Sequence, residues 1–432
     1  MAKFIRSLCT NRPTAAGRAA YTNCAGTILT LWPREAPQLL FSDEPGAEKP
    51  FSYLFINLIL VDIRATVPSL LAKLNDPESP QTSRRLASAL DVLAAFIGHL
   101  LAWMEELDAS DEELPAAEKT TTFNMAPDLT IKLGRSIGET ISVLLEYLRD
   151  RWDAAVAGAP GLHPEARTGA AHTSLGSRKT LAWDAGGESG DVAADPSTLS
   201  AVRAAALWLR DDDGDALRRE AAGLMDMFLE LYRQSSSSAP APSGAAAAAA
   251  RYDYRLPVLA ALEGVLRIPD GIDAFAAHDG WQTLSADLVS IQTSTSTSVL
   301  TPDSELLRGT RIALALSIVA ESEFETGAST TPESWMGLVT AVAAYDVPET
   351  SKRGGEADGE KAALALPLLE FQTDVLRLAA SLLRAASPGM RRRYAHTADA
   401  VRGVGAQLRR GAAAAGNALA AAELDDVLAM LS

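Results

Sequence analysis

The histidines and acidic residues of this sequence could do chemistry, but their spacing does not form a catalytic set. No H-E-x-x-H or C-x-x-C motif occurs, so no zinc-protease or dithiol signature is present. Adjacent carboxylates such as Glu105 and Glu106 point to different faces of a helix and do not converge on a substrate. We therefore expect no catalytic residue, no metal site and no cofactor. The five histidines are scattered over His99, His163, His172, His278 and His396.

Two short segments resemble a phosphate loop and a calcium loop, and both depart from the pattern. In "LGSRKT", Ser177 stands where a P-loop has its lysine, and no predicted strand precedes it. In "RDDDGDALRRE", placing Gly214 at the turn glycine puts Leu209 at the first calcium ligand. We interpret this second segment as a polar connector in which Asp213 or Asp215 caps the following helix.

The stretch "EYLRDRWDAAVAGAPGLHPEAR", residues 146–167, is a candidate binding surface because a helix ends there in charges and a Gly/Pro loop. Edges and loops of helical repeats often bind partners. The alternative is that Arg149 and Asp153 pair at i, i+4 and Trp152 fills the core. The apolar stripe of this helix comprises Ile137, Ile141, Leu144, Leu148 and Trp152. The predicted partner-binding residues are Tyr147, Arg149, Asp150, Arg151, His163 and Arg167.

A second candidate surface is basic. Between Met390 and Gly411 the sequence has six arginines and one aspartate, in a chain of formal net charge −16. Anionic lipid attracts such clusters at about 1 kcal/mol per basic residue, and an acidic protein surface would act similarly. The predicted basic docking patch consists of Arg391, Arg392, Arg393, Arg402, Arg409 and Arg410.

The amino-acid composition favours a helical fold and excludes some classes of function. The 432 residues are 47% hydrophobic but only 6% aromatic, which favours close-packed helices. The acidic balance argues against a nucleic-acid partner, because phosphate repels a surface of the same sign. Two cysteines and no N-x-S/T sequon predict reduced thiols and a cytosolic or nuclear location.

The helices that must position these residues can be predicted from the apolar residues, which recur with the 3.6-residue helical period along almost the whole chain. Apolar and polar residues nowhere alternate over a long stretch, as they would in strands. Proline and capping signals mark several starts, including Asp195-Pro196. The amino-terminal residues already lie within a helical pattern, which predicts further helices upstream. The expected helices are 13–31, 34–41, 50–74, 81–107, 127–156, 197–211, 215–234, 254–266, 270–277, 279–292, 303–324, 332–345, 361–386, 388–410 and 415–431.

Many helices in series without strands predict an all-α fold, an armadillo/HEAT-like α-solenoid with degenerate repeats that extends over residues 1–432. A compact helical globule is the structural rival. Segments poor in apolar residues bury too little surface to offset their ordering entropy, so we expect disordered insertions there. These insertions are expected at about 108–126, 168–195, 234–252, 292–302 and 347–360.

Two apolar runs have some resemblance to membrane spans. Phe51–Val61 is shorter than the roughly 20 residues that a spanning helix needs. Leu86–Met104 is long enough but contains Asp91 and His99. A helix buried on most sides within a helical stack produces the same pattern, and we expect that arrangement for both.

Several blocks, found in order over most of the chain, together resemble the neurochondrin family and in particular its fungal branch. The resemblance implies a cytoplasmic armadillo/HEAT-like scaffold without enzymatic activity. We expect it to act as an adaptor or an assembly factor that binds protein partners on its helical surface. The alternative is a peripheral adaptor that binds an anionic membrane surface through the basic patch. The blocks are "LLFSDE", "PFSYLFINLILVDIRATVPSLL", "SRRLASALDVLAAFIG", "EYLRDRWDAAVAGAPGLHPEAR", "LWLRDDDGDALRREAAGLMDMFLELY", "LPVLAALEG" and "WMGLVTAVAAYD".

Overall fold

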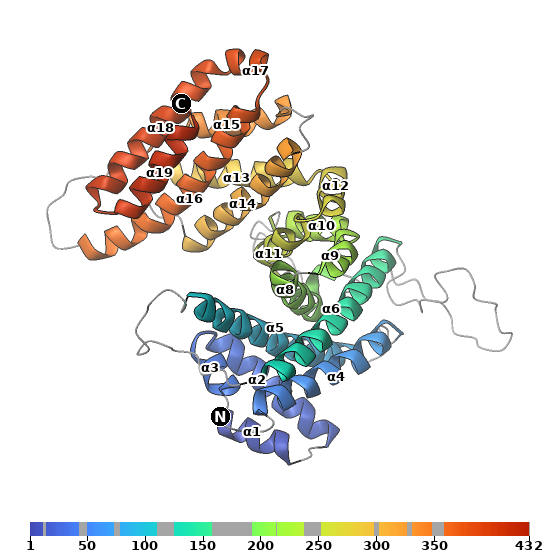
Figure 1. Cartoon of the computed structure of the whole chain (residues 1–432). Coiled ribbons are helices and arrows are strands. Elements are labelled where there is room, and N and C mark those ends of the chain that lie inside the picture. Colours follow the sequence, from blue (N-terminus) through green and yellow to red (C-terminus); the bar gives the residue numbers. More distant parts are fainter. Residues whose placement is uncertain are drawn as a thin grey trace, which may run out of the picture. The chain divides into compact units, whose positions relative to one another are not determined.

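The described residues are helical, as the sequence predicts. In the computed structural model they form eighteen α-helices and two short 3₁₀ helices, and they contain no β-strand (Figure 1). The all-α fold class is therefore confirmed. The structure describes residues 1–11, 14–42, 50–72, 78–109, 125–157, 192–212, 214–236, 252–297, 302–325, 331–347 and 358–431.

The helices group into two compact units, Met1–Val265 (unit 1) and Leu266–Ser432 (unit 2). Each unit is a stack of two helical layers. The helices of unit 1 are α1 (Ala2–Thr10), α2 (Ala15–Leu31), α3 (Glu35–Phe41), α4 (Phe51–Ala72), α5 (Ser79–Ala109), α6 (Pro127–Val156), η2 (Val192–Ala194), α8 (Pro196–Asp211), α9 (Asp215–Ala222), α10 (Met225–Ser236) and α11 (Arg255–Val265).

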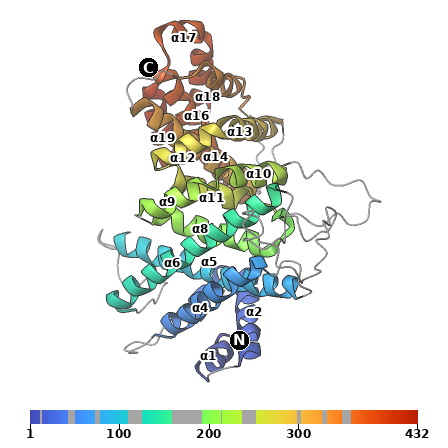
Figure 2. The same ribbon diagram turned by 90° about the vertical axis from the view of Figure 1, so that its right-hand side faces the viewer.

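In unit 1, α2, α5, α8 and α11 follow one another in one layer, and α4, α6 and α9 form the other. Across the layers α4 packs on α5, α6 on α8 and α9 on α11, an arrangement that can be followed in Figure 2. The apolar stripe expected on α6 lies in this interior. Ile137, Ile141, Leu144 and Leu148 are fully buried, and Trp152 is half-buried.

Unit 2 repeats this two-layer plan. Helices α14, α16 and α19 form one layer, α13, α15 and α18 form the other, and each consecutive pair packs across the two. Its helices are α12 (Pro269–Ala277), α13 (Gly280–Thr297), α14 (Asp303–Glu325), η3 (Glu333–Trp335), α15 (Met336–Ala343), α16 (Asp358–Ala385), α17 (Pro388–Arg393), α18 (Ala395–Ala414) and α19 (Ala418–Met430).

Close helix crossings explain two of the glycines in unit 1. A Cβ atom on Gly264 of α11 would lie 2.2 Å from the carbonyl oxygen of Leu209 in α8. A Cβ atom on Gly26 of α2 would lie 2.9 Å from the carbonyl oxygen of Ser88 in α5. Both distances are shorter than van der Waals contact, so these crossings require residues without a side chain.

Three predicted boundaries need correction. The single helix expected at 215–234 is divided at Gly223, and the one expected at 388–410 is divided at Tyr394. The insertion expected at 292–302 begins as helix, because α13 continues to Thr297 and buries Gln292 and Thr295. The side chain of Gln292 donates to Gln372 Oε1 of α16 at 2.9 Å. This buried amide contact offsets the low apolar content on which the prediction relied.

The remaining expected insertions fall largely on residues that the structure does not describe. The undescribed residues at these insertions are 110–124, 158–191, 237–251, 298–301 and 348–357. The end of the insertion expected at 168–195 is described, and there the prediction was wrong. Val192 and Ala193 are buried in η2, and Tyr254 Oη donates to the carbonyl oxygen of Ala193 at 3.2 Å.

Among the described residues, two helical segments have the length and hydropathy of a membrane span, Phe51–Leu70 and Ser79–Glu105. They differ in their packing. In α5, 56% of the most apolar 18-residue segment is buried within the protein, whereas in α4 the corresponding share is 39%. Helix α4 therefore leaves more of its apolar surface outside the stack than α5 does.

Candidate interaction surfaces

Two of the binding residues predicted on α6 lie in the core. Tyr147 and Arg151 expose only 2% and 5% of their surface. Arg151 Nη2 lies 2.6 Å from Asp195 Oδ2, and Arg151 Nη1 donates to Tyr147 Oη at 3.4 Å. The prediction that these two side chains face a partner is wrong. They follow Leu144 and Leu148 at a spacing of three residues, and this spacing returns them to the buried face of the helix.

Asp195 is the centre of a buried polar cluster that joins three helices. Its carboxylate caps the amino terminus of α8 by accepting from Ser197 N and Ser197 Oγ, each at 2.9 Å. It also accepts from Ser83 Oγ of α5 and pairs with Arg151 of α6. Burial raises the pKa of the nearby Tyr147 phenol, an effect that the Arg151 charge partly offsets. Because the acceptor oxygens of Asp195 are used within the fold, we assign this cluster to stability.

The exposed part of the predicted surface bridges α6 to the helices that follow. Arg149 is exposed, and its Nη2 donates to the carbonyl oxygen of Glu220 in α9 at 2.6 Å. Trp152 Nε1 donates to Asp226 Oδ2 of α10 at 2.8 Å. The expected alternative pair of Arg149 with Asp153 is not among the ion pairs of the described residues. Asp150 is half-buried, and the predicted residues His163 and Arg167 lie outside the described residues.

Most of the predicted basic patch is engaged within unit 2. Arg391 Nε donates to the carbonyl oxygen of Ala386 at 2.8 Å, at the carboxyl end of α16. Arg402 lies 2.6 Å from Asp399 and donates to the carbonyl oxygen of Leu431 at 2.7 Å. Three further contacts are Arg393 with Glu333, Arg409 with Asp425, and Arg410 with the carbonyl oxygen of Ala406. Only Arg392, among the six, has no such contact in the described part of unit 2.

The structure also shows where one further motif and His99 lie. The residues Gly134-Arg135-Ser136-Ile137-Gly138 match the G-x-S-x-G pattern of hydrolases, and the expectation that the sequence lacks this motif was wrong. They lie inside α6, and Ser136 Oγ accepts from Arg64 at 3.1 Å. A hydrolase serine instead occupies a sharp turn between a strand and a helix. His99 is buried 5.8 Å from the ring of Phe41, as expected for a core histidine.

The polar connector before α9 is also placed. Gly214 occupies the cap position of that helix without a side-chain cap, so Asp215 is not the cap that we expected. Asp213 lies outside the described residues. Among those described, no three His, Cys, Asp or Glu side chains come together as metal ligands would. The "LGSRKT" segment, whose interpretation depended on Ser177, also lies outside them.

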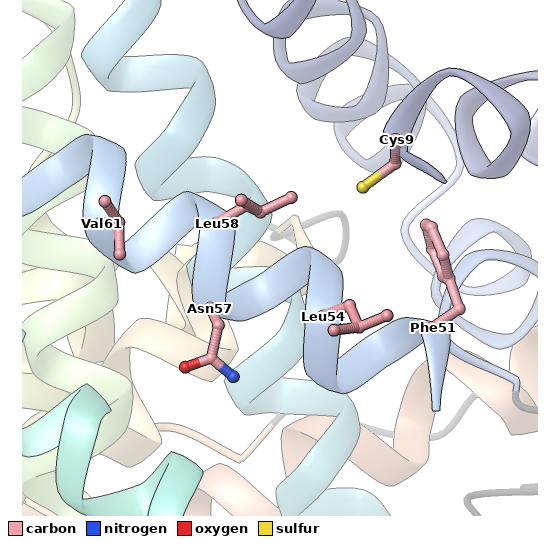
Figure 3. A pocket seen from close by; sticks show the side chains of 6 residues that line it. All are labelled: Cys9, Phe51, Leu54, Asn57, Leu58 and Val61. Atoms are coloured by element: carbon pink, nitrogen blue, oxygen red, sulfur yellow. The ribbon is translucent and has the colours of Figure 1, made fainter. Parts of the chain in front are cut away.

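A groove that the sequence interpretation missed runs along α4. It has a volume of about 370 Å³ and lies between the amino-terminal part of α4 and the Cys9 side of α1 (Figure 3). The exposed fractions of Leu54, Leu58 and Val61 are 40%, 36% and 55%. From Phe51 to Val61, α4 is almost entirely apolar, and such a segment is expected to be buried. One of its apolar faces instead remains exposed. The groove is lined by Cys9, Phe51, Leu54, Asn57, Leu58 and Val61.

The same face continues beyond the groove. Ala65 and Pro68, one and two turns after Val61, are exposed as well. The opposite side of α4 packs into the stack, where Phe55, Ile59 and Ile63 are buried. The signal that could have predicted this face is the alternation of three- and four-residue steps from Phe51 to Pro68, which forms a second apolar stripe beside the core stripe.

Comparison with known proteins identifies the family. The sequence profile of the neurochondrin family matches residues 1–340. The chain belongs to the neurochondrin family. An uncharacterized protein of the fission yeast Schizosaccharomyces pombe is 26% identical over 163 residues, which is 38% of this chain and 22% of that protein. The chain thus matches less than a quarter of the length of this relative. No solved structure matches the chain.

Proposed function

We propose that this protein is a non-enzymatic scaffold that holds protein partners on the outer faces of its helices. Membership of the neurochondrin family supports this function, and the polar clusters of the described residues are consistent with it. The Arg151–Asp195 pair and the Gln292–Gln372 contact each connect helices within one unit, as groups with a structural role do. We expect the protein to act in the cytoplasm without a cofactor.

The observation that supports this proposal most is the exposed apolar face of α4. Single exposed apolar residues are ordinary, but a contiguous row of them on a folded protein indicates an interaction site. Leu54, Leu58 and Val61 form such a row. The neighbouring helix α6 adds the exposed side chains of Ile131 and Glu139 to the same layer of unit 1.

Affinity purification of the full chain from its source cells, with quantitative mass spectrometry, tests the proposal. We expect one or a few proteins to be retained in stoichiometric amounts at physiological salt. Each should then bind the purified full chain in a saturable titration. Retention of no protein above the level of an unrelated helical control, or turnover of a small molecule by the purified chain, would contradict the proposal.

The alternative function, a peripheral membrane adaptor, has weaker support. It depends on the basic patch, in which Arg393, Arg402 and Arg409 already pair with carboxylates of unit 2, and this pairing reduces the net charge that the patch can offer to a lipid head group. Sedimentation of the full chain with vesicles rich in phosphatidylserine separates the two functions. The scaffold proposal predicts no vesicle binding at physiological salt.

A further inference from the structure

We propose that the exposed face of α4 is the docking site for an amphipathic helix of a partner protein, one with large aliphatic residues on one side and acidic residues beside them. This inference rests on the proposed scaffold function and specifies the chemistry of one partner. It follows from the spacing of the exposed residues, the shape of the groove and the charges at its rim.

The spacing is that of a coiled-coil seam. Successive members of the face are three and four residues apart in alternation, and helices that pair along their length use this pattern. At 1.5 Å per residue the face is about 26 Å long, enough to contact about five turns of a second helix. Its members, all apolar, are Phe51, Leu54, Leu58, Val61, Ala65 and Pro68.

The shape favours a helix over a flat surface. Cys9 of α1 lies across from α4, so the amino-terminal half of the face is the floor of a groove (Figure 3). Side chains of an entering helix can fill a groove of about 370 Å³. The smaller residues Ala65 and Pro68 form the carboxyl-terminal end of the face and permit close approach of a partner backbone there.

Four arginines lie on or beside α4 near this face, although the whole chain is acidic. On one side, Arg18 of α2 and Arg85 of α5 share the single carboxylate of Asp62, at 3.8 and 3.5 Å. On the other side, Arg64 Nη1 pairs with Glu139 Oε2 at 2.9 Å. At the amino-terminal end, the guanidinium of Arg6 lies 5.0 Å from the centre of the Phe51 ring. These contacts bring together four guanidinium groups and two carboxylates, an excess of two positive charges, and Arg6 also donates to the carbonyl oxygens of Leu40 and Ser42.

This excess of positive charge favours an acidic partner over the other molecules that could bind the apolar face. A partner helix with Asp or Glu beside its apolar stripe would meet complementary charge along both rims. A second copy of this chain would instead present the same basic rim, and like charges would face each other. A bilayer could not enter the groove between α1 and α4, because a lipid surface is broad compared with one helix. An acidic amphipathic helix matches both the shape and the charge.

A fluorescence anisotropy titration of the full chain with a designed peptide tests the proposal. The probe is a labelled helical peptide of about 20 residues, with Leu at the seam positions and Glu beside them. One control peptide has Ser in place of Leu, and the other has Lys in place of Glu. The variant Leu58→Asp changes the middle of the face. The matched control is Leu314→Asp in α14, because Leu314 is similarly exposed, at 45% against 36%.

We expect the Glu-flanked peptide to bind wild type and Leu314→Asp alike. Binding to Leu58→Asp should be weaker by at least about tenfold. Binding should also weaken with added salt, and neither control peptide should match the probe. Circular dichroism should show the same helix content for both variants, because each changes an exposed side chain.

Several results would overturn the proposal. Equal peptide binding by wild type and Leu58→Asp would place the site elsewhere, and stronger binding of the Lys-flanked peptide would refute the charge argument. A dimer in sedimentation velocity that Leu58→Asp dissociates would assign the face to a second copy. Flotation with neutral vesicles that the same change abolishes would assign it to lipid. If natural partners still copurify with Leu58→Asp, the scaffold function stands without this docking site.

Discussion

Replacing Arg151 should destabilise unit 1 far more than replacing Arg149, two residues away on the same helix. The side chains of the Arg151–Asp195 pair are only 6% and 11% exposed. Loss of one member of a buried pair costs about 3–5 kcal/mol, because the other charge remains buried without its partner. Asp195 would keep its hydrogen bonds from Ser83 and Ser197, so we expect the lower end of this range.

The expected cost for Arg151→Met is therefore about 3 kcal/mol, with methionine chosen to retain most of the side-chain volume. For a unit of this size, a loss of about 3 kcal/mol corresponds to a decrease in melting temperature of about 6–10 °C. Arg149→Ala removes one exposed hydrogen bond to the carbonyl oxygen of Glu220 and should cost less than about 1 kcal/mol.

Thermal unfolding followed by far-UV circular dichroism measures both variants. The double variant Arg151→Met with Asp195→Asn removes both charges and retains a capping residue, so it should recover part of the lost stability. Equal, small shifts for Arg151→Met and Arg149→Ala would refute the assignment of this cluster to the core. Equal, small shifts are what the sequence-based prediction requires, since it placed both Arg149 and Arg151 on the surface.

Three further changes test the packing. Gly264→Ala should destabilise unit 1 by about 1–3 kcal/mol by thermal melting, because its Cβ would collide with the α8 backbone. Its control Gly403→Ala, with no atom within 4 Å, should be neutral or stabilising. Burial raises the pKa of Asp91, so stability should fall as pH rises from the ordinary pKa towards the raised one. Asp91→Asn should weaken this trend in denaturation midpoints measured across pH. Arg391→Glu should lower the melting temperature of unit 2 because Arg391 binds carbonyls at the end of α16, whereas Arg392→Glu should not. Similar melting temperatures within either matched pair, or an unchanged pH trend, would contradict these assignments.

The helices could be predicted from the sequence because apolar periodicity and capping residues are local signals. Asp195-Pro196 marks the start of α8, and the stripe from Ile137 to Leu148 is buried as expected. The division at Tyr394 was missed, since the residues on both sides favour helix and the pattern continues through the break.

The candidate surfaces were harder to predict because a charged side chain does not reveal its partner. Arg151 lies at helical spacing from the core residues Leu144 and Leu148, but no local signal shows that Asp195, 44 residues later in the chain, supplies the opposite charge that a buried arginine requires. The exposed face of α4 was missed for the opposite reason. The apolar run from Phe51 to Val61 predicts burial. Its second stripe can be found from the spacing of residues, but the packing of α5 and α6 shows that this stripe is the one left open.

Hydroxyl-radical footprinting of the full chain, alone and bound to a protein that copurifies with it, tests the scaffold function most directly. The scaffold account predicts that the partner protects exposed side chains on the helix surfaces, with Leu54, Leu58 and Val61 of α4 among them, while Leu314 stays equally reactive. Protection confined to the basic residues of α17 and α18, or no change in reactivity anywhere on the helices, would contradict it.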